Sequence, residues 1–292
     1  MKPPSFEYAA PKTVDEAVSL LKQNEGEAKI LAGGQSLMPL LNMRLARPGI
    51  LVDVARVDGL DYIREVDGAV AIGAMTRQRA VEHSEAVRLR FPLVHTAILH
   101  IAHPQNRNQG TVGGSLAHAD PAAELPAIAL ALDAEFRAVG PGGERRIKAA
   151  DFFVTYLTTA LEPSEVLTEV RFPALPPRTG WSFIELARRH GDFALTGVVA
   201  ILTCGAGNRC TAAQIVLFGV GATPVRARRA EQLFIGEPLK EALLAQAGQT
   251  ASAEIEEPLS DVHASAEYRR DLARILTRRA LSEAAAKAAA AG

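Results

Sequence analysis

The first part of the chain combines one amphipathic stretch with two short apolar runs. Thr13 is followed three positions later by Glu16, a capping box that marks the start of a helix. Apolar residues then recur at steps of three and four, which is the spacing of one helix face. These positions are Val14, Ala17, Val18 and Leu21. The apolar runs 29–32 and 50–54 are too short for helices, so we expect buried strands that flank the segment 33–47.

A second unit begins near residue 62, and its sequence contains both strand-like and helix-like apolar runs. The runs 135–139 and 144–147 flank Gly-Pro-Gly-Gly at 140–143, a strong hairpin signal. The other elements expected here are strands at 69–72 and 166–172 and helices at about 91–102 and 125–132.

The chain then reaches three prolines within residues 173–177, which favour a linker because proline sustains neither a ladder nor a helix. We therefore predict two domains, 1–175 and 178–292, the first divided into subdomains of about 1–58 and 59–175. In the second domain we expect strands at 181–186, 196–204 and 213–219 and helices at 226–233, 239–249 and 268–290. This order predicts a sheet with helices on one face.

Composition narrows the class of protein. The 292 residues are 48% hydrophobic with a formal net charge of −1, which is typical of a globular protein and argues against a nucleic-acid partner. The basic cluster at 226–229 is interpreted as a solvated helix face. The N-terminus lacks the apolar core of a secretory signal and no segment is long enough to span a bilayer, so we expect a cytoplasmic protein. Two cysteines, Cys204 and Cys210, cannot build a four-thiolate iron–sulfur centre.

The candidate chemistry lies in two glycine-rich turns, residues 32–37 (Ala-Gly-Gly-Gln-Ser-Leu) and 110–116 (Gly-Thr-Val-Gly-Gly-Ser-Leu), whose Gly-Gly steps are 80 residues apart. Each omits Cβ atoms where backbone N–H groups could close on an anion, which suits a diphosphate. Neither turn has the GxGxxG or the GxxxxGK[ST] pattern. Gly-Gly pairs also mark ordinary turns, and that interpretation stays open for either turn alone.

The flanks of both turns extend the pattern. The first turn continues into Met-Pro-Leu-Leu at 38–41, and the second lies between His-Pro-Gln-Asn-Arg-Asn-Gln at 103–109 and Ala-His-Ala-Asp-Pro at 117–121. Together with Glu-Val-Leu at 165–167 and Arg-Arg-His-Gly-Asp-Phe-Ala at 188–194, these strings resemble the medium, FAD-binding subunit of the molybdenum hydroxylases, the family of xanthine dehydrogenase and aerobic carbon monoxide dehydrogenase. The resemblance implies an α+β fold: a two-subdomain FAD-binding domain of the vanillyl-alcohol-oxidase-like type, then a smaller α+β domain with a three-stranded antiparallel sheet and helices.

The resemblance also implies which residues hold FAD. Those expected on one side of the pyrophosphate are Ala32, Gly33, Gly34, Gln35, Ser36 and Leu37, and those on the other side are Thr111, Gly114 and Ser115. Acidic side chains at Asp120 and Glu124 would accept hydrogen bonds from ribityl or ribose hydroxyls. Phe193 is expected near the flavin ring, and Ile101 and Leu167 match apolar positions that face the flavin or the adenine.

Structural alternatives stand beside several of these assignments. Asp120 could instead cap a helix with Pro121 at its first position, and Phe193, Ile101 and Leu167 could be ordinary core. No catalytic residue is assigned on this chain, and the spacing of His103, His118 and His190 does not form a metal-ligand set.

The family resemblance implies partners. A large subunit would carry the molybdenum cofactor, a small ferredoxin-like subunit would carry two [2Fe-2S] clusters, and FAD here would pass electrons to an external acceptor, in a dimer of heterotrimers. Carbon monoxide dehydrogenases tend to have His at Gln35, Asp at Ser115 and another aromatic segment around Phe193, which weakens that substrate for this chain. The alternatives are a self-sufficient flavin oxidase, with the flavin attached covalently or not, and a non-redox nucleotide-binding scaffold.

Overall fold

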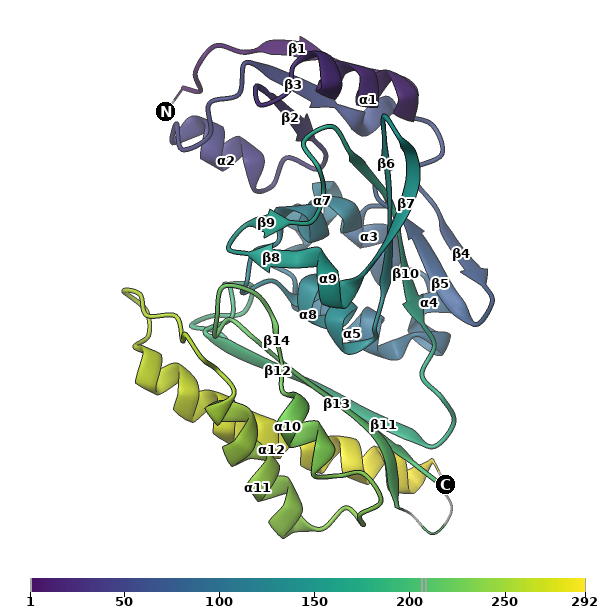
Figure 1. The fold of residues 1–292 in the computed structure, drawn as a ribbon, viewed down its shortest axis with the longest axis vertical. Helices are drawn as coiled ribbons and strands as arrows, with labels where there is room; N and C mark the ends of the chain where they lie inside the picture. Colours follow the sequence, from purple (N-terminus) through teal and green to yellow (C-terminus); the bar gives the residue numbers. More distant parts are fainter. Residues whose placement is uncertain (1, 206, 208, 292) are drawn as a thin grey trace.

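The structure is a computed structural model that describes residues 2–205, 207 and 209–291. Figure 1 shows three units stacked along the long axis, with the N-terminal unit at the top and the C-terminal helices at the bottom. The middle unit is the largest, and it contacts both of the others.

The first unit is a small parallel sheet covered by a capped helix. Its elements are β1 (Glu7–Ala9), α1 (Val14–Gln23), β2 (Ala28–Leu31), α2 (Leu37–Asn42), β3 (Ile50–Asp53) and the 3-10 turn η1 (Val54–Arg56). The strand order is β1-β3-β2, with both pairs parallel. The predicted capping box is confirmed: Thr13 Oγ1 accepts from the N–H of Glu16 at 3.1 Å, and the Glu16 carboxylate accepts from the N–H of Thr13 at 3.4 Å.

The second unit is an antiparallel five-stranded sheet with helices on one side. The sheet order is β4-β5-β10-β6-β7, from β4 (Ile63–Val66), β5 (Ala69–Gly73), β6 (Glu135–Gly140), β7 (Gly143–Lys148) and β10 (Val166–Pro173). The helices are α3 (Gln78–Glu82), α4 (Glu85–Arg90), α5 (Pro92–His100), α6 (Pro104–Gln109), α7 (Val112–His118), α8 (Glu124–Ala131) and α9 (Ala149–Phe152), and β8 (Phe153–Thr155) pairs with β9 (Thr158–Thr159). The predicted hairpin is confirmed as β6 and β7.

Three local expectations in this unit are corrected. The second glycine-rich segment is the start of helix α7 rather than a turn between elements. A helix starting at Pro121 was an alternative for Asp120, but residues 121–122 form a turn and α8 begins only at Glu124. The proline-rich linker also begins one residue later than expected, since Pro173 still pairs with Ala69 at the end of β10.

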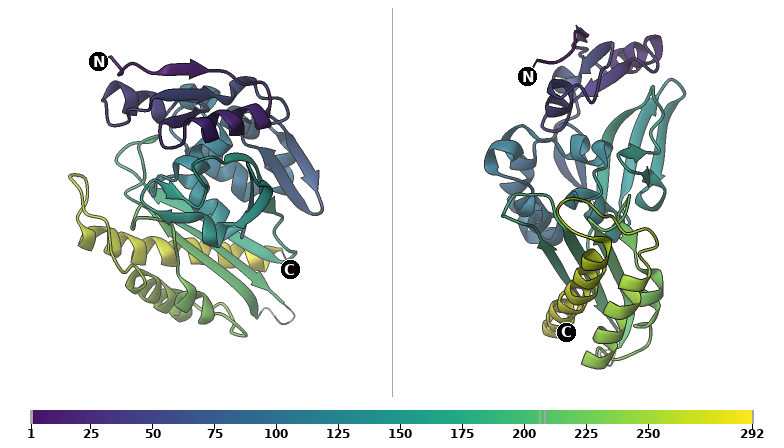
Figure 2. Two further views of the ribbon diagram at one scale, coloured as in Figure 1. Left: turned by 45° about the horizontal axis from the view of Figure 1, so that its top comes forward. Right: turned by 90° about the vertical axis from the view of Figure 1, so that its left-hand side faces the viewer.

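The third unit is an antiparallel sheet buried on both faces. Its elements are β11 (Thr179–Leu186), β12 (Thr196–Cys204), β13 (Cys210–Phe218), β14 (Val225–Arg226), α10 (Arg228–Gln232), α11 (Glu241–Ala253) and α12 (Ala266–Ala290). The predicted three strands are present, and the two-residue β14 adds a short fourth. The three helices cover one face, as Figure 2 shows, while side chains of the other face, such as Phe183 and Phe218, join the core of α5 and α8.

Among the described residues, no helix is both long enough and apolar enough to span a membrane. The long helix α12 carries charged residues throughout its first half. The division of the chain into domains at 175–178 stays a prediction.

Candidate cofactor-binding site

The first glycine turn joins the end of β2 to the start of α2. Gly34 has a φ of 71°, a left-handed conformation that glycine adopts without strain. Among the described residues, the N–H groups of Gly34, Gln35, Ser36 and Leu37 have no acceptor, and Ser36 makes no capping bond with its side chain. Four adjacent donors are therefore available at this turn, an arrangement that suits an anion.

The second glycine segment uses its N–H groups differently. The N–H of Val112 donates to the carbonyl of Thr76 at 3.0 Å, and that of Gly113 to the carbonyl of Ala74 at 2.9 Å. The N–H of Gly114 donates to Thr111 Oγ1 at 3.0 Å. The expectation of free N–H groups is therefore wrong for Val112, Gly113 and Gly114, whereas the N–H of Thr111 has no acceptor among the described residues. What this segment offers instead is a surface without Cβ atoms and the hydroxyl of Ser115.

The two segments lie against each other although they are far apart in sequence. A Cβ atom on Gly33 would approach the carbonyl oxygen of Gln109 to 2.4 Å, and one on Gly114 would lie 3.4 Å from the Cβ of Ala32. Asn106 also donates to the Gln35 side chain at 3.2 Å. Gly33 is thus required by close backbone approach, whereas Gly114 packs against the first turn at ordinary contact distance. The structure brings together the residues at 32–37 and 111–115 that the sequence singled out.

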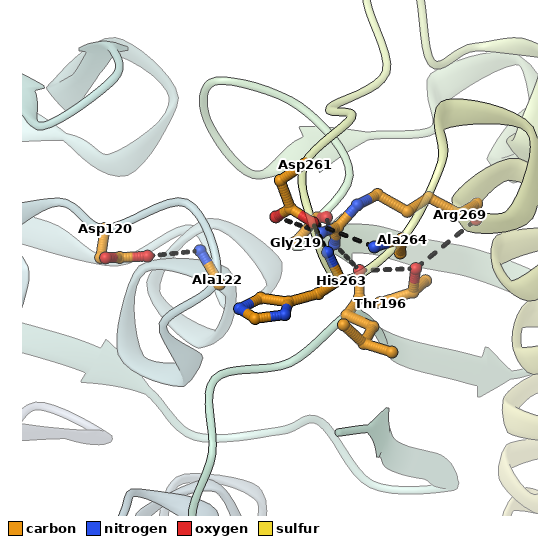
Figure 3. A network of polar contacts seen from close by, with 9 residues as sticks. Asp120, Ala122, Thr196, Gly219, Asp261, His263, Ala264 and Arg269 are labelled. Atoms are coloured by element: carbon orange, nitrogen blue, oxygen red, sulfur yellow. Dashed lines mark hydrogen bonds and ion pairs between the residues drawn. The ribbon is translucent and has the colours of Figure 1, made fainter. Parts of the chain in front are cut away.

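Asp120 and Glu124 follow α7 and occupy different environments. Asp120 Oδ1 accepts a hydrogen bond from the N–H of Ala122 at 2.9 Å, which Figure 3 shows. Glu124 is only 5% exposed at the start of α8. Burial, together with the nearby carboxyl of Glu185, raises the pKa of Glu124 to about 8. Glu124 is therefore mainly protonated at neutral pH, so its carboxyl can donate as well as accept a hydrogen bond.

A loop of the third unit, residues 187–195, reaches this region. Gly191 has a φ of 86°, and a Cβ atom there would lie 2.5 Å from the imidazole of His103. The rings of His103 and His190 stack with centroids 6.4 Å apart. Phe193 in the same loop is 61% exposed, so the alternative that it is ordinary core does not hold. The loop therefore approaches residues 102–103 at Gly191 and exposes the ring of Phe193 to solvent.

Two buried arginines, which the sequence did not single out, hold these segments in place. Arg107 is 5% exposed, pairs with Glu82 through bonds of 3.0 and 3.1 Å, and donates to the carbonyl of Ile101 at 2.8 Å. Ala102 beside it has a φ of 41°, which is strained for a residue with a Cβ atom. The many bonds of Arg107 explain how that conformation is held.

Arg269 on α12 is the second arginine, and Figure 3 shows its network. It donates to the carbonyl of Leu195, to that of Gly219 at 2.8 Å, and to Asp261 Oδ2 at 2.7 Å. The N–H of Gly219 in turn donates to the carbonyl of Pro121 at 2.8 Å. Arg269 therefore links the end of the 187–195 loop to the segment that follows Asp120.

The remaining predicted positions are buried. Ile101 is 9% and Leu167 is 6% exposed, and both belong to the main hydrophobic cluster. Their contact with a cofactor stays a prediction. Among the described residues, no group of histidine, cysteine, aspartate and glutamate is arranged to hold a metal ion.

Both parts of the chain match models of known protein families. Residues 4–175 match the FAD binding domain in molybdopterin dehydrogenase, and residues 181–284 match the CO dehydrogenase flavoprotein C-terminal domain. The chain belongs to the FAD-binding subunits of the molybdenum hydroxylases. The family assignment made from the sequence is confirmed, and so is the fold class: an FAD-binding domain is followed by a smaller domain with an antiparallel sheet.

Individual members of this flavoprotein family match over nearly their whole length. The 6-hydroxypseudooxynicotine dehydrogenase complex subunit alpha of Paenarthrobacter nicotinovorans is 43% identical over 97% of this chain and 96% of that protein. The carbon monoxide dehydrogenase medium chain of Hydrogenophaga pseudoflava is 40% identical over 99% of this chain and 100% of that protein. Relatives of similar identity thus carry the names of different substrates, so membership does not identify the substrate.

Solved structures give the same picture. Carbon monoxide dehydrogenase from Hydrogenophaga pseudoflava superposes with a TM-score of 0.95 at 40% identity, covering 98% of this chain and 99% of that one. Quinoline 2-oxidoreductase from Pseudomonas putida 86 gives a TM-score of 0.92 at 39% identity, covering 99% of both chains. The relatives include a subunit of a dehydrogenase complex and the medium chain of a carbon monoxide dehydrogenase, and one solved relative is a Cu,Mo-containing carbon monoxide dehydrogenase.

Proposed function

We propose that this chain is the electron-transfer subunit of a heterotrimeric molybdenum hydroxylase. It takes electrons from iron–sulfur clusters on a small partner, which receives them from a molybdenum cofactor on a large partner, and passes them to an external acceptor. The observation that carries the proposal is that the full-length family match coincides with the meeting of the two glycine segments. The finer predictions, a dimer of heterotrimers and a cytoplasmic location, belong to this proposal.

The residues of this chain fit a dinucleotide diphosphate. Among the described residues the N–H groups at 34–37 have no acceptor and so are available to an anion, and Gly33 and Gly114 allow the two segments to pack against each other. We propose that residues 32–37 bind the pyrophosphate with Thr111, Gly114 and Ser115 opposite, and that Asp120 and Glu124 bind the sugar hydroxyls. The isoalloxazine supplies the redox chemistry, while the protein provides binding and orientation.

The proposal is tested by producing the chain alone and together with its natural partner subunits. Alone, it should bind FAD noncovalently, so that acid precipitation releases all the yellow colour. With its partners, it should co-purify as three polypeptides that contain molybdenum and iron. Flavin retained on the denatured chain, together with substrate oxidation by this chain alone, would instead establish a self-sufficient oxidase, and a folded chain without flavin would establish a non-redox scaffold.

Phe193→Ala tests the role of the 187–195 loop. If the exposed ring covers the flavin, its loss opens one side of the cofactor to solvent and oxygen and removes stacking of about 0.5–1.5 kcal/mol. We expect faster reoxidation by air and FAD affinity lowered by roughly two- to twelvefold, since 1.4 kcal/mol is a factor of ten. Stopped-flow reoxidation of the dithionite-reduced protein measures the first effect, and FAD titration measures the second.

The matched control is Ile235→Ala, because Ile235 is similarly exposed, at 53%, in the loop that follows α10. The control should leave both readouts unchanged. If Phe193→Ala reoxidises and binds FAD like the control, Phe193 does not cover the flavin.

A further inference from the structure

The segment that follows the first glycine turn exposes apolar and basic side chains together. Three large apolar residues and two arginines of α2 and the loop after it are exposed to solvent, and we call them the α2 surface: Met38, Met43, Arg44, Leu45 and Arg47. Figure 1 shows α2 at the outer edge of the first unit, close to the N-terminal end of the chain. Clustered apolar groups at such a position are typical of a surface that binds another protein.

A strained helix end holds part of this surface in place. The N–H of Arg44 donates to the carbonyl of Leu41 and that of Leu45 to the carbonyl of Leu40, both at 2.9 Å, which is the Schellman arrangement. The first residue after the helix cap in this motif is usually glycine, but here it is Arg44 with a φ of 59°, which is strained for a residue with a Cβ atom. The next residue commonly packs back on the helix, whereas Leu45 is 72% exposed. The helix end is thus less stable than one with glycine would be, and it presents Leu45 to solvent.

The two arginines of the α2 surface have no carboxylate partner among the described residues. The Nε of Arg44 donates to the carbonyl of Lys2 at 3.4 Å, and the Nε of Arg47 donates to the carbonyl of Arg44 at 3.1 Å. Residues 28–52 contain neither aspartate nor glutamate. The surface therefore carries positive charge that the chain itself does not compensate, and such charge attracts carboxylates on a partner.

A second exposed leucine on a basic surface provides a contrast. Leu89 on α4 is 61% exposed and lies between Arg88 and Arg90. Here, however, Arg88 pairs with Glu85 at 3.5 Å, and Arg90 pairs with Glu65. The charges beside Leu89 are compensated within the chain, whereas those of the α2 surface are not.

The α2 surface adjoins the segment proposed to bind the pyrophosphate. Helix α2 begins at Leu37, whose N–H group is the last of the four that are available to an anion. The Met38 side chain lies beside the glycine turn, since a Cβ atom on Gly34 would be 3.2 Å from Met38 Cγ. A protein bound to the α2 surface is therefore placed next to the cofactor site, where an electron donor has to bind.

We propose that the α2 surface is the docking site for the iron–sulfur subunit, and that this partner presents an apolar contact surrounded by carboxylates. The inference rests on the proposed electron-transfer function. The uncompensated guanidinium groups favour an acidic partner, and the three exposed apolar side chains supply the dry centre of an interface. Docking buries Leu45, the most exposed apolar residue of the surface, and pairs Arg44 and Arg47 with carboxylates of the partner.

The test is the affinity of the FAD-loaded chain for its separately produced iron–sulfur subunit, measured by isothermal titration at low and at high salt. Leu45→Ser should weaken binding about tenfold, the effect of truncating a buried residue at the centre of an interface. Arg47→Ala should reduce the dependence of the affinity on salt, because one ion pair with the partner is lost. Leu89→Ser is the matched control and should bind like the wild type. The FAD content should be the same in all four proteins.

Arg44→Gly separates docking from a purely structural role. Glycine adopts the φ of 59° without strain, so the urea midpoint of unfolding should rise while the affinity for the iron–sulfur subunit falls. A structural role alone would move both quantities in the same direction.

The possible failures of the docking site and of the proposed function differ. Wild-type affinity in Leu45→Ser, Arg47→Ala and Arg44→Gly overturns the docking site and leaves the proposed function intact. Loss of the large subunit alone, when these variants are co-purified with all partner subunits, also overturns it, as does loss of FAD from Leu45→Ser and Arg47→Ala. A wild-type chain that binds FAD but no iron–sulfur polypeptide overturns the proposed function itself.

Discussion

Gly114→Val is expected to abolish stoichiometric FAD binding while leaving the helix and strand content intact. Gly114 does not have a positive φ, so the effect comes from space rather than from backbone strain. Its Cβ atom would lie 2.6 Å from Thr111 Oγ1, 3.4 Å from the Cβ of Ala32 and 3.9 Å from the nitrogen of Gly33. The branched side chain would thus force the two glycine segments apart at the point where we propose that the pyrophosphate lies.

The expected loss of FAD affinity follows from the number of backbone N–H donors that are misplaced. A hydrogen bond to a charged group contributes about 1.5–3 kcal/mol, so misplacing two of the free N–H groups of the first turn weakens FAD binding by roughly 10²- to 10⁴-fold. The cost to folding is smaller: a disturbed N-cap at Thr111 costs about 1 kcal/mol. Isothermal titration with FAD measures the first effect, and circular dichroism with urea unfolding measures the second.

Two other glycines provide the controls. At Gly142 a Cβ atom would meet nothing within 4 Å, so Gly142→Val should bind FAD normally. At Gly113, the neighbour of Gly114, a Cβ atom would lie 2.4 Å from the Cβ of Ala74 and 2.7 Å from its carbonyl oxygen. Gly113→Val should therefore lower the free energy of unfolding. A folded Gly114→Val protein with wild-type FAD affinity would refute a pyrophosphate site at this position.

Local signals account for the parts of the fold that the sequence predicted. The capping box at Thr13 and the Gly-Pro-Gly-Gly hairpin at 140–143 act over a few residues, and both are present as predicted. β1 was missed because it has only three residues and owes its existence to pairing with residues 50–52. The short helix α7 was missed for a similar reason: two glycines lower helix propensity, but bonds from Val112 and Gly113 to Thr76 and Ala74 fix its start.

Some residues of the candidate site could be identified from the sequence, and others could not. Glycine-rich strings identified residues 32–37 and 111–115, because glycine at a close approach is visible in a sequence. The buried arginines were not visible, because arginine is mostly exposed and their partners are backbone carbonyls and acids from distant elements. The carboxyl group of Glu185, whose Oε2 is buried without a hydrogen-bond partner among the described residues, was equally hidden, since its burial depends on how β11 packs against α5.

Arg269→Ala is expected to lower the free energy of unfolding by about 1–3 kcal/mol, the cost of leaving a buried hydrogen-bonding group without its partner; the ionic partner Asp261 is 47% exposed and adds little. Arg269 is 3% exposed, and its guanidinium serves Leu195, Gly219 and Asp261 at once. Removing it leaves the carbonyl oxygen of Gly219 without a donor, whereas that of Leu195 keeps the hydrogen bond from the Thr196 hydroxyl. Because Leu195 ends the loop that carries Phe193, FAD binding should weaken as well.

The control for this prediction lies on the same helix. Arg274 contacts Asp271 at 3.9 Å with 45% of its side chain exposed, so Arg274→Ala should change stability by less than about 0.5 kcal/mol. Arg269→Lys keeps the positive charge, but a lysine ammonium group lacks the planar fork by which the guanidinium reaches three partners. The free energy of unfolding of this variant should therefore lie between those of the wild type and Arg269→Ala. Urea unfolding with and without FAD measures the whole series. Equal unfolding midpoints for Arg269→Ala and Arg274→Ala would show that the 187–195 loop is held by other contacts, and that Arg269 does not join the third unit to the cofactor site.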